Sequence, residues 1–345
     1  MKMMDILPSF TWKARYTMKR FLSILMILIV SMTFVFAEGA KENPYIGSEP
    51  VQEELPPMRI AALKGPTGMG LVGVMDKDRA GEDYVFTIEA KPDAILPKVV
   101  KGEVDAACIP ANLASVLWNK TNGGVQVGAI NTLGVVYIAE KGDTVHSIED
   151  LRGKTIYSAG KGMTPEYALN NILKQYGLEI GKDVYVEWKT EHAEALAALD
   201  NADNAVAMLP QPFMTSAMMK NPDVREALDL NQLWYDAMGD KLIAGVVIIQ
   251  KDYAEKHPER VQQFLDDYKA SVEFVHENRK EAADLIGEFK IFNPQLAFKA
   301  LPKCNIVFID GEEMKNALTT YYGVLLEQNP QAVGGKLPSD EFYLR

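Results

Sequence analysis

The sequence predicts an α/β fold made of two similar lobes. Residues 104–110 and 204–210 are apolar runs that end in proline, and a helix-like segment follows each of them. Upstream, residues 59–69 and 154–165 share a second pattern, in which a strand leads through a glycine-rich turn into the start of a helix. Because open α/β sheets bind small molecules at the ends of their strands, two matched lobes indicate a ligand in the cleft between them.

The first lobe is predicted from short apolar strands that alternate with helices. Residues 92–101 have apolar side chains at helical spacing, and residues 134–139 form an apolar run that carries the chain toward the second lobe. The other expected elements are strands at 59–63, 84–89, 104–110 and 125–130 and a helix from about Met69.

The second lobe is predicted to repeat this order. Residues 147–153 form a capped helical turn that ends at glycine. Thr164 is expected to be the N-cap of a helix that has Pro165 in its first position and stops at Gly177. The remaining elements are strands at 184–188 and 205–209, a helix at 191–199, a return strand at 244–249 and a mostly helical part from Pro258 onward.

Two crossings between the lobes predict a two-strand hinge. The first lobe is then discontinuous, with residues 58–136 and 246–345, and the second lobe is continuous, with residues 137–245.

The N-terminus predicts export. Lys19 and Arg20 precede an uncharged segment at 21–36, and small residues at Val35 and Ala37 suit a signal peptidase. We expect a signal peptide at 1–37, cleaved near Ala37, and a flexible spacer at 38–57. A retained anchor is the alternative, although the segment is short beside the roughly 20 apolar residues that a membrane span needs. Either Met1 or Met18 can be the start of translation.

The charge and the cysteine and histidine content limit which partners and metal ions we expect the protein to bind. The chain has 36 Lys and Arg against 47 Asp and Glu, a net charge of −11. Loss of residues 1–37 would remove five basic residues and one acidic residue, leaving 31 against 46 and a net charge of −15. Such a surface repels phosphate backbones, so we expect a protein that does not bind nucleic acid. We also expect a monomer, since no long apolar segment follows Phe36. Cys108 and Cys304 are expected to be buried thiols, with one disulfide as the alternative, and the four scattered histidines predict no metal site.

One motif favours an enzyme. Gly68, Gly70 and Gly73 match a dinucleotide-binding pattern after a strand, and Glu89 follows where an acidic residue could bind a ribose. The competing interpretation is a helix N-terminus whose bare N–H groups face a ligand. No nucleophile and base have catalytic spacing, so we expect a protein without enzymatic activity or cofactor.

Neutral polar side chains at predicted strand ends suit ligand binding better than catalysis. Lys161, in the second glycine-rich turn, is either a solvated turn residue or a cation that attracts an anionic ligand. Trp234 could stack on a planar ring or belong to the core. The other candidate polar contacts are Asn112, Asn131, Thr132 and Gln211.

Three segments, at residues 147–156, 207–213 and 251–260, are similar to those of the solute-binding proteins of ABC importers. The chain resembles the branch that serves nitrate, taurine, alkanesulfonates and pyrimidine precursors of thiamine. This resemblance implies the type II periplasmic-binding-protein fold, whose lobes close over one small organic solute and present it to a membrane permease. The ligand contacts that it implies are Gly65, Pro66, Thr67, Gly68, Met69, Pro110, Ala111, Asn112, Gly160, Lys161, Gly162, Met163, Thr164, Gln211, Pro212 and Phe213.

Gln211 departs from the pattern of this branch. Many relatives have an acidic residue at that position, so the charge of the ligand does not follow from the resemblance. An enzyme of pyrimidine or cofactor-precursor metabolism on the same fold is one alternative, and a surface protein whose cleft has degenerated is another.

Overall fold

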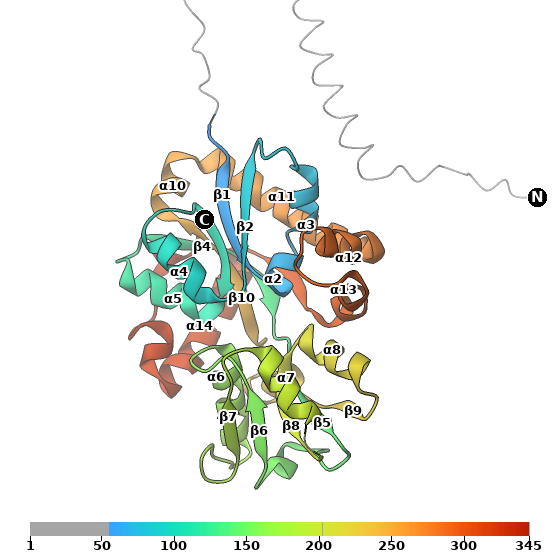
Figure 1. Ribbon diagram of the computed structural model, residues 1–345. Coiled ribbons are helices and arrows are strands. Elements are labelled where there is room, and N and C mark those ends of the chain that lie inside the picture. The colour runs from blue at the N-terminus through green and yellow to red at the C-terminus, as the bar shows by residue number, and fades with distance from the viewer. Residues whose placement is uncertain (1–54, 202, 345) are drawn as a thin grey trace, which may run out of the picture. The chain divides into compact units, whose positions relative to one another are not determined.

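The computed structural model describes residues 55–201 and 203–344. The predicted signal peptide and most of the predicted spacer lie outside these residues. Two β-sheets with helices packed on them make up the part that is described, and they lie one beyond the other in Figure 1. We call the first sheet with its helices the first lobe, and the second sheet with its helices the second lobe.

The first sheet has the strand order β11-β4-β10-β3-β1-β2. Strand β1, next to the edge strand β2, pairs in parallel with β2 and β3, while β10 lies antiparallel between β3 and β4. The strands are β1 (Met58–Leu63), β2 (Tyr84–Glu89), β3 (Ala106–Pro110), β4 (Val125–Leu133), β10 (Ile243–Gln250) and β11 (Ile306–Ile309).

The second sheet has the order β7-β6-β8-β5-β9 and repeats the pairing of the first. Here β6 pairs in parallel with β7 and β8, and β5 lies antiparallel between β8 and β9. Strand by strand, β7-β6-β8-β5-β9 corresponds to β2-β1-β3-β10-β4, which confirms the predicted similarity of the lobes. The strands are β5 (Val136–Lys141), β6 (Thr155–Ser158), β7 (Tyr185–Trp188), β8 (Val206–Pro210) and β9 (Val224–Asp229).

The chain passes between the sheets at residues 134–135 and 239–242. These two crossings lie side by side, because the N–H of Gly134 donates to the carbonyl of Leu242 over 2.7 Å. A Cβ on Gly134 would lie 2.2 Å from Oδ1 of Asn231. Position 134 therefore has no room for a side chain unless Asn231 and Leu242 shift.

Helices cover both sheets and bury the apolar faces of their strands (Figure 1). None of the described helices is long and apolar enough to cross a membrane. The helices are α2 (Pro66–Met69), α3 (Val72–Lys77), α4 (Pro92–Val100), α5 (Ala111–Lys120), α6 (Thr164–Gln175), α7 (His192–Asp200), α8 (Phe213–Lys220), α9 (Leu230–Met238), α10 (Lys251–Lys256), α11 (Pro258–Glu277), α12 (Arg279–Glu288), α13 (Pro294–Ala300) and α14 (Gly311–Gln328).

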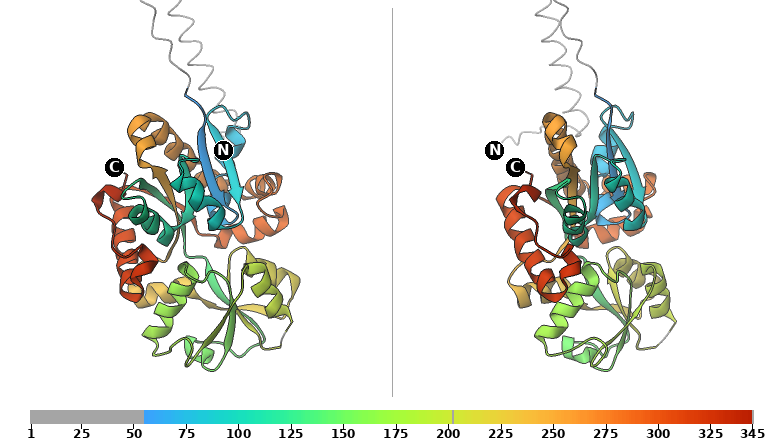
Figure 2. Two further views of the ribbon diagram at one scale, coloured as in Figure 1. Left: turned by 60° about the vertical axis from the view of Figure 1, so that its left-hand side comes forward. Right: turned by 90° about the vertical axis from the view of Figure 1, so that its left-hand side faces the viewer.

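The C-terminal helix α14 packs against both lobes, and Figure 2 shows it running along the side of the molecule from one lobe to the other. It contacts α5 and β4 of the first lobe and α6 of the second. Its fully buried Tyr321 places a hydroxyl 3.0 Å from that of Thr164 and packs against Trp234, with ring centroids 6.0 Å apart.

Several details differ from the sequence expectations. The first helix begins at Pro66 rather than near Met69, and it breaks at Gly70 before α3 begins. Met163, not Thr164, is the N-cap of α6. Strands β9 and β11 were not expected, and β11 interrupts the C-terminal helical part. Cys108 and Cys304 are both buried free thiols.

Candidate functional site

A cavity of about 340 Å³ lies between the two lobes. The crossing segment closes it at Val135, and the ends of strands from both sheets form its walls. The first lobe contributes Leu63, Lys64, Ala90, Lys91, Pro92, Pro110, Ala244 and Phe292, and the second contributes Val136, Ala159, Gly160, Met163, Thr164, Pro165, Thr190, Glu191, His192, Ala193, Pro210 and Phe213.

The walls are three matched pairs of strand ends. The end of β1 supplies residues 63–64 and the end of β6 supplies residues 159–160. The turns after β2 and β7 supply residues 90–92 and 190–193, and β3 and β8 both end in a proline that lines the cavity. The internal repeat seen in the sequence thus builds one shared site, at the position where open α/β sheets bind ligands.

The structure brings part of the expected site together at this cavity. Pro110, Gly160, Met163, Thr164 and Phe213 line it. The other expected contacts do not line the cavity. They are Gly65, Pro66, Thr67, Gly68, Met69, Ala111, Asn112, Asn131, Thr132, Lys161, Gly162, Gln211, Pro212 and Trp234.

The turn at residues 65–69 folds back onto its own strand instead of facing the cavity. A Cβ on Gly68 would lie 2.5 Å from the carbonyl oxygen of Leu63, so this buried glycine is not at a loop tip. Leu63 and Lys64, just before the turn, line the cavity in its place.

Close packing explains the glycine pattern that had favoured a dinucleotide site. A Cβ on Gly70 would lie 3.0 Å from Ile306, and one on Gly73 would lie 2.8 Å from the hydroxyl of Ser271. Glu89 forms an ion pair with Lys98 on α4, with 2.6 Å between the charged atoms. These residues therefore support the packing of the first lobe.

Four of the expected polar contacts, Asn112, Asn131, Thr132 and Gln211, are buried and do not line the cavity. The amide of Asn112 lies 3.4 Å from the carbonyl of Gly162, and Oε1 of Gln211 accepts hydrogen bonds from Thr215. Asn131 accepts a hydrogen bond from Thr132. Trp234 is buried against Tyr321 and belongs to the core.

The sequence analysis did not identify His192, whose imidazole lies in the cavity wall. The side chain is half-buried, but its Nδ1 atom has no exposed surface and no hydrogen-bond partner. Burial lowers the pKa of His192 to about 4, so its imidazole is neutral at physiological pH. The repeat could have revealed it, since His192 stands one hundred residues after Pro92 at the start of the matching helix.

Two contacts join the lobes beside the cavity. Nζ of Lys91 lies 2.8 Å from Oε1 of Glu191. Phe213 meets Phe292 edge to face, with centroids 6.0 Å apart and planes at 87°, and His192 packs on Phe213 at 5.3 Å. The sequence analysis also did not identify Phe292, because this residue lies between α12 and α13 and no strand end is near it in the sequence.

Comparison with known proteins agrees with this architecture. The family model described as NMT1/THI5 like matches residues 125–282. An ABC transporter protein from Parabacteroides distasonis has a TM-score of 0.72 at 23% identity, over 84% of this chain and 99% of that one. The aliphatic sulphonate binding protein SsuA from Escherichia coli has a TM-score of 0.69 at 16% identity, over 84% and 92% of the two chains.

A Candida albicans protein described as exhibiting the generic periplasmic binding protein structural fold has a TM-score of 0.55 at 14% identity, over 84% of this chain and 93% of its own. The chain has the periplasmic-binding-protein fold. The fold implied by the sequence resemblance is therefore confirmed. No curated protein sequence matches the chain.

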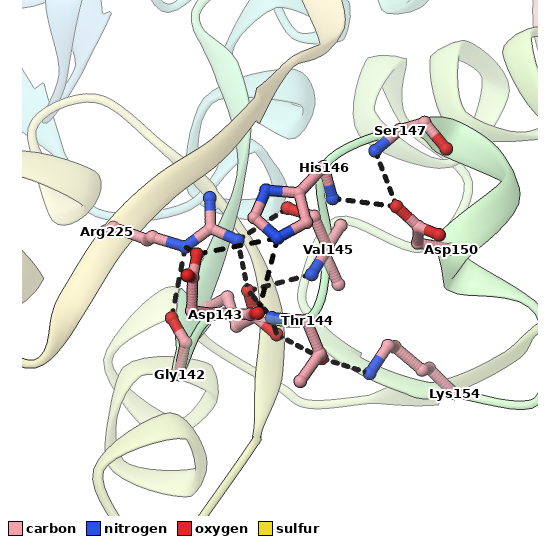
Figure 3. Close-up of polar contacts among 10 residues, drawn as sticks. Gly142, Asp143, Thr144, Val145, His146, Ser147, Asp150, Lys154 and Arg225 are labelled. Atoms are coloured by element: carbon pink, nitrogen blue, oxygen red, sulfur yellow. Dashed lines mark hydrogen bonds and ion pairs between the residues drawn. The ribbon is translucent and has the colours of Figure 1, made fainter.

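A polar network in the second lobe of this periplasmic-binding-protein fold holds the loop after β5. Figure 3 shows Arg225 reaching the carbonyls of Gly142 and Val145. The fully buried carboxylate of Glu140 pairs with Arg225 at 2.6 Å and accepts hydrogen bonds from Thr144 and Val145.

The charge of Glu140 is balanced within this network. Burial alone would raise the pKa of Glu140, but the hydrogen bonds from Thr144 and Val145 and the charge of Arg225 outweigh it and lower that pKa. No residue of the network lines the interlobe cavity. We conclude that this network holds the loop in place, while the cavity is the candidate ligand site of the periplasmic-binding-protein fold.

Proposed function

We propose that the chain is an exported, non-enzymatic solute receptor of an ABC importer. Its two lobes close over one small organic solute, and the closed form delivers that solute to the permease. A cavity shared by three matched pairs of strand ends carries this proposal, because a ligand that touches both lobes stabilises their closed arrangement over the open one.

The similar structures support the same class of function. They include an ABC transporter protein, a sulphonate binding protein and the ligand-binding component of an ABC-type import system. Cleavage of the signal near Ala37 would place the mature chain outside the cytoplasm, where such receptors work.

Native mass spectrometry of the exported protein tests this proposal directly. We expect a small molecule to co-purify with the wild type. Ala90→Trp should reduce retention of this molecule at least tenfold, because Ala90 is exposed at the cavity wall and an indole there would fill the space. Ala94→Trp is the matched control, since Ala94 is also exposed, in the first turn of α4, but does not line the cavity.

Lobe closure gives a second test. Spin labels at Lys120→Cys and Tyr185→Cys would stand on exposed positions of the two lobes, and the buried Cys108 and Cys304 should stay unlabelled. The distance between the labels should shorten when the co-purified molecule is added back. Retention of that molecule by Ala90→Trp together with an unchanged distance would overturn the proposed function.

A further inference from the structure

A second cavity, of about 180 Å³, lies beside the interlobe cavity, and we call it the side pocket. It is a groove between α7 and α8 of the second lobe, and Phe292 and Leu296 of the first lobe complete its wall. Phe213, Phe292 and Ala193 line both cavities. The contact between the two phenyl rings, one from each lobe, therefore separates the side pocket from the interlobe cavity.

Phe292 is held in a closely packed corner between α12 and α13. Ile291 before it is buried, and the N–H of Ile291 donates to a carbonyl of α12 over 3.0 Å. Oδ1 of Asn293 caps α13 by accepting hydrogen bonds from two backbone N–H groups. A Cβ on Gly287 would lie 2.3 Å from Pro294, so the two helices meet without space between them. The corner therefore fixes where the ring of Phe292 points.

Phe213 is supported from its own lobe. The ring of His192 packs on that of Phe213 with centroids 5.3 Å apart, and Phe292 meets Phe213 edge to face from the other lobe. An edge-to-face contact is favourable because the positive edge of one ring faces the negative face of the other. Since each ring is positioned by its own lobe, the pair forms only when the lobes approach each other at this edge.

The first lobe repeats the side pocket without the ring pair. A groove of about 270 Å³ lies between α4 and α5, the helices that are equivalent to α7 and α8. Leu113 lines it, one hundred residues before Phe213, and the whole lining comes from the first lobe. The ring contact is thus added at the groove that adjoins the interlobe cavity. This position suits a role in solute binding rather than in the packing of a lobe.

We propose that Phe213 and Phe292 form a length gate for the solute. When the lobes close, the rings meet and confine the solute to the interlobe cavity. A solute that extended into the side pocket would have to lie between the rings, and it would hold the lobes apart at this edge. This inference rests on the proposed function and adds the size class of its solute, which is a compact molecule that does not reach the side pocket.

Two series of probes test the gate. The 1-alkanols and the 1-alkanesulfonates of two to ten carbons are neutral and anionic, and within each series only the length changes. Calorimetric titration of the mature protein should show affinity that increases about fourfold per added CH₂ group until the chain fills the interlobe cavity, and that falls at greater lengths. Chains longer than this optimum should leave the distance between labels at Lys120→Cys and Tyr185→Cys unchanged, because the rings cannot meet around them.

Truncation of one ring should open the gate. Phe292→Ala should move the optimum to chains at least two carbons longer, because the side pocket then joins the interlobe cavity, and these chains should bind at least tenfold more tightly than to the wild type. Phe213→Leu, which introduces the residue type of the equivalent position in the first lobe, should shift the optimum in the same direction. Phe298→Ala is the matched control, since Phe298 lies on α13 with its ring 4.4 Å from the guanidinium carbon of Arg279 and lines neither cavity. Thermal unfolding curves show whether each variant is folded.

Two results would overturn the gate: the same optimum length in the wild type and Phe292→Ala, or no saturable binding of any chain to Phe292→Ala. Both are distinct from failure of the proposed function. If the co-purified molecule closes the lobes while the optimum length stays the same, the receptor function stands and the gate is wrong. If neither that molecule nor any probe changes the label distance, the receptor function fails, whichever chain binds best.

Discussion

Lys91 and Glu191 meet across the cleft from equivalent positions of the two lobes. Each residue is the N-cap of its helix, with φ of −136° at Lys91 before α4 and −137° at Glu191 before α7. They stand one hundred residues apart, and their opposite charges lie 2.8 Å from each other. The internal repeat has thus diverged at this position into a cation on one lobe and an anion on the other.

Charge reversal at this pair should favour the open arrangement of the lobes. Lys91→Glu places two carboxylates face to face, so we expect a longer distance between labels on the two lobes and weaker retention of the solute. The double variant Lys91→Glu/Glu191→Lys restores the opposite charges and should restore both quantities. Since both side chains are about half exposed, the effect should decrease between 50 mM and 500 mM salt. Identical label distances in all three proteins would contradict this prediction.

Gly134→Ala should destabilise the protein by roughly 2 kcal/mol, because its new methyl group would lie 2.2 Å from Asn231 and 2.9 Å from Leu242. Gly323→Ala, in the middle of α14 with no atom within 4 Å of the new Cβ, should be neutral or stabilising by up to about 1 kcal/mol. Urea denaturation of the two variants and the wild type measures both changes, and equal midpoints for the two variants would refute the steric account.

Two glycines that the sequence placed in similar turns should respond differently to alanine. Gly68→Ala brings a Cβ within 2.5 Å of a backbone carbonyl, so we expect a loss of roughly 2 kcal/mol or more, or failure to fold. Gly162→Ala meets no atom within 4 Å and suffers only from its φ of +75°, which costs about 1 kcal/mol. Circular dichroism during thermal unfolding distinguishes the two variants, and equal melting temperatures would contradict this prediction.

Acid should destabilise the protein through His192. Its pKa is about 4 in the folded chain against 6.5 ordinarily, so the unfolded chain takes up the proton first as the pH falls. The stabilising contribution is complete above pH 6.5 and is lost between pH 6.5 and 4, by roughly 3.5 kcal/mol at about 1.4 kcal/mol per pKa unit. His192→Phe should flatten the pH dependence of the free energy of unfolding in this window, measured by urea denaturation at half-unit pH steps. An unchanged slope would show that the imidazole is not shielded from water.

Glu140→Gln tests the polar network of the second lobe. Loss of the carboxylate leaves Arg225 without its buried partner, so we expect a decrease of about 2 kcal/mol in the free energy of unfolding at pH 7. The pKa of Glu140 is lowered, so its contribution is present above pH 4.5 and is lost as the pH falls through the folded value. The variant and the wild type should therefore converge in stability at low pH. Glu149→Gln, at an exposed residue of the neighbouring turn, should change little.

The repeat in the sequence predicted most of the fold, because strand ends and helix starts leave local patterns in the sequence. The proline that ends β3 and the proline that ends β8 located two strand ends, and Gly160 with Thr164 located a third. Strands β9 and β11 escaped notice for different reasons. The segment Val224–Asp229 alternates poorly and carries charges, and Ile306–Ile309 is only 4 residues long between helices.

The candidate site was harder to predict, because a cavity depends on which side of each turn faces the other lobe. Gly68 resembled a residue that lets a ligand approach, but its missing Cβ makes room for the carbonyl of Leu63. Phe292 reaches the cavity through the packing of α12 and α13, and local sequence carries no signal of that contact. Lys91 and His192 could have been found, since the repeat that aligns residues 104–110 with 204–210 also aligns the turns before them.

The position of α14 makes the two edges of the interface between the lobes unequal. Separating the lobes at α14 costs more free energy than separating them at the opposite edge. Moving α6 away from α14 would expose the hydroxyl of Thr164 and the rings of Tyr321 and Trp234, which are fully or nearly fully buried. Moving Lys91 away from Glu191 separates two groups that water already reaches. Opening this edge also parts Phe213 from Phe292, which are both partly exposed. We therefore expect the lobes to open by rotation about α14, at the edge that carries the charged pair.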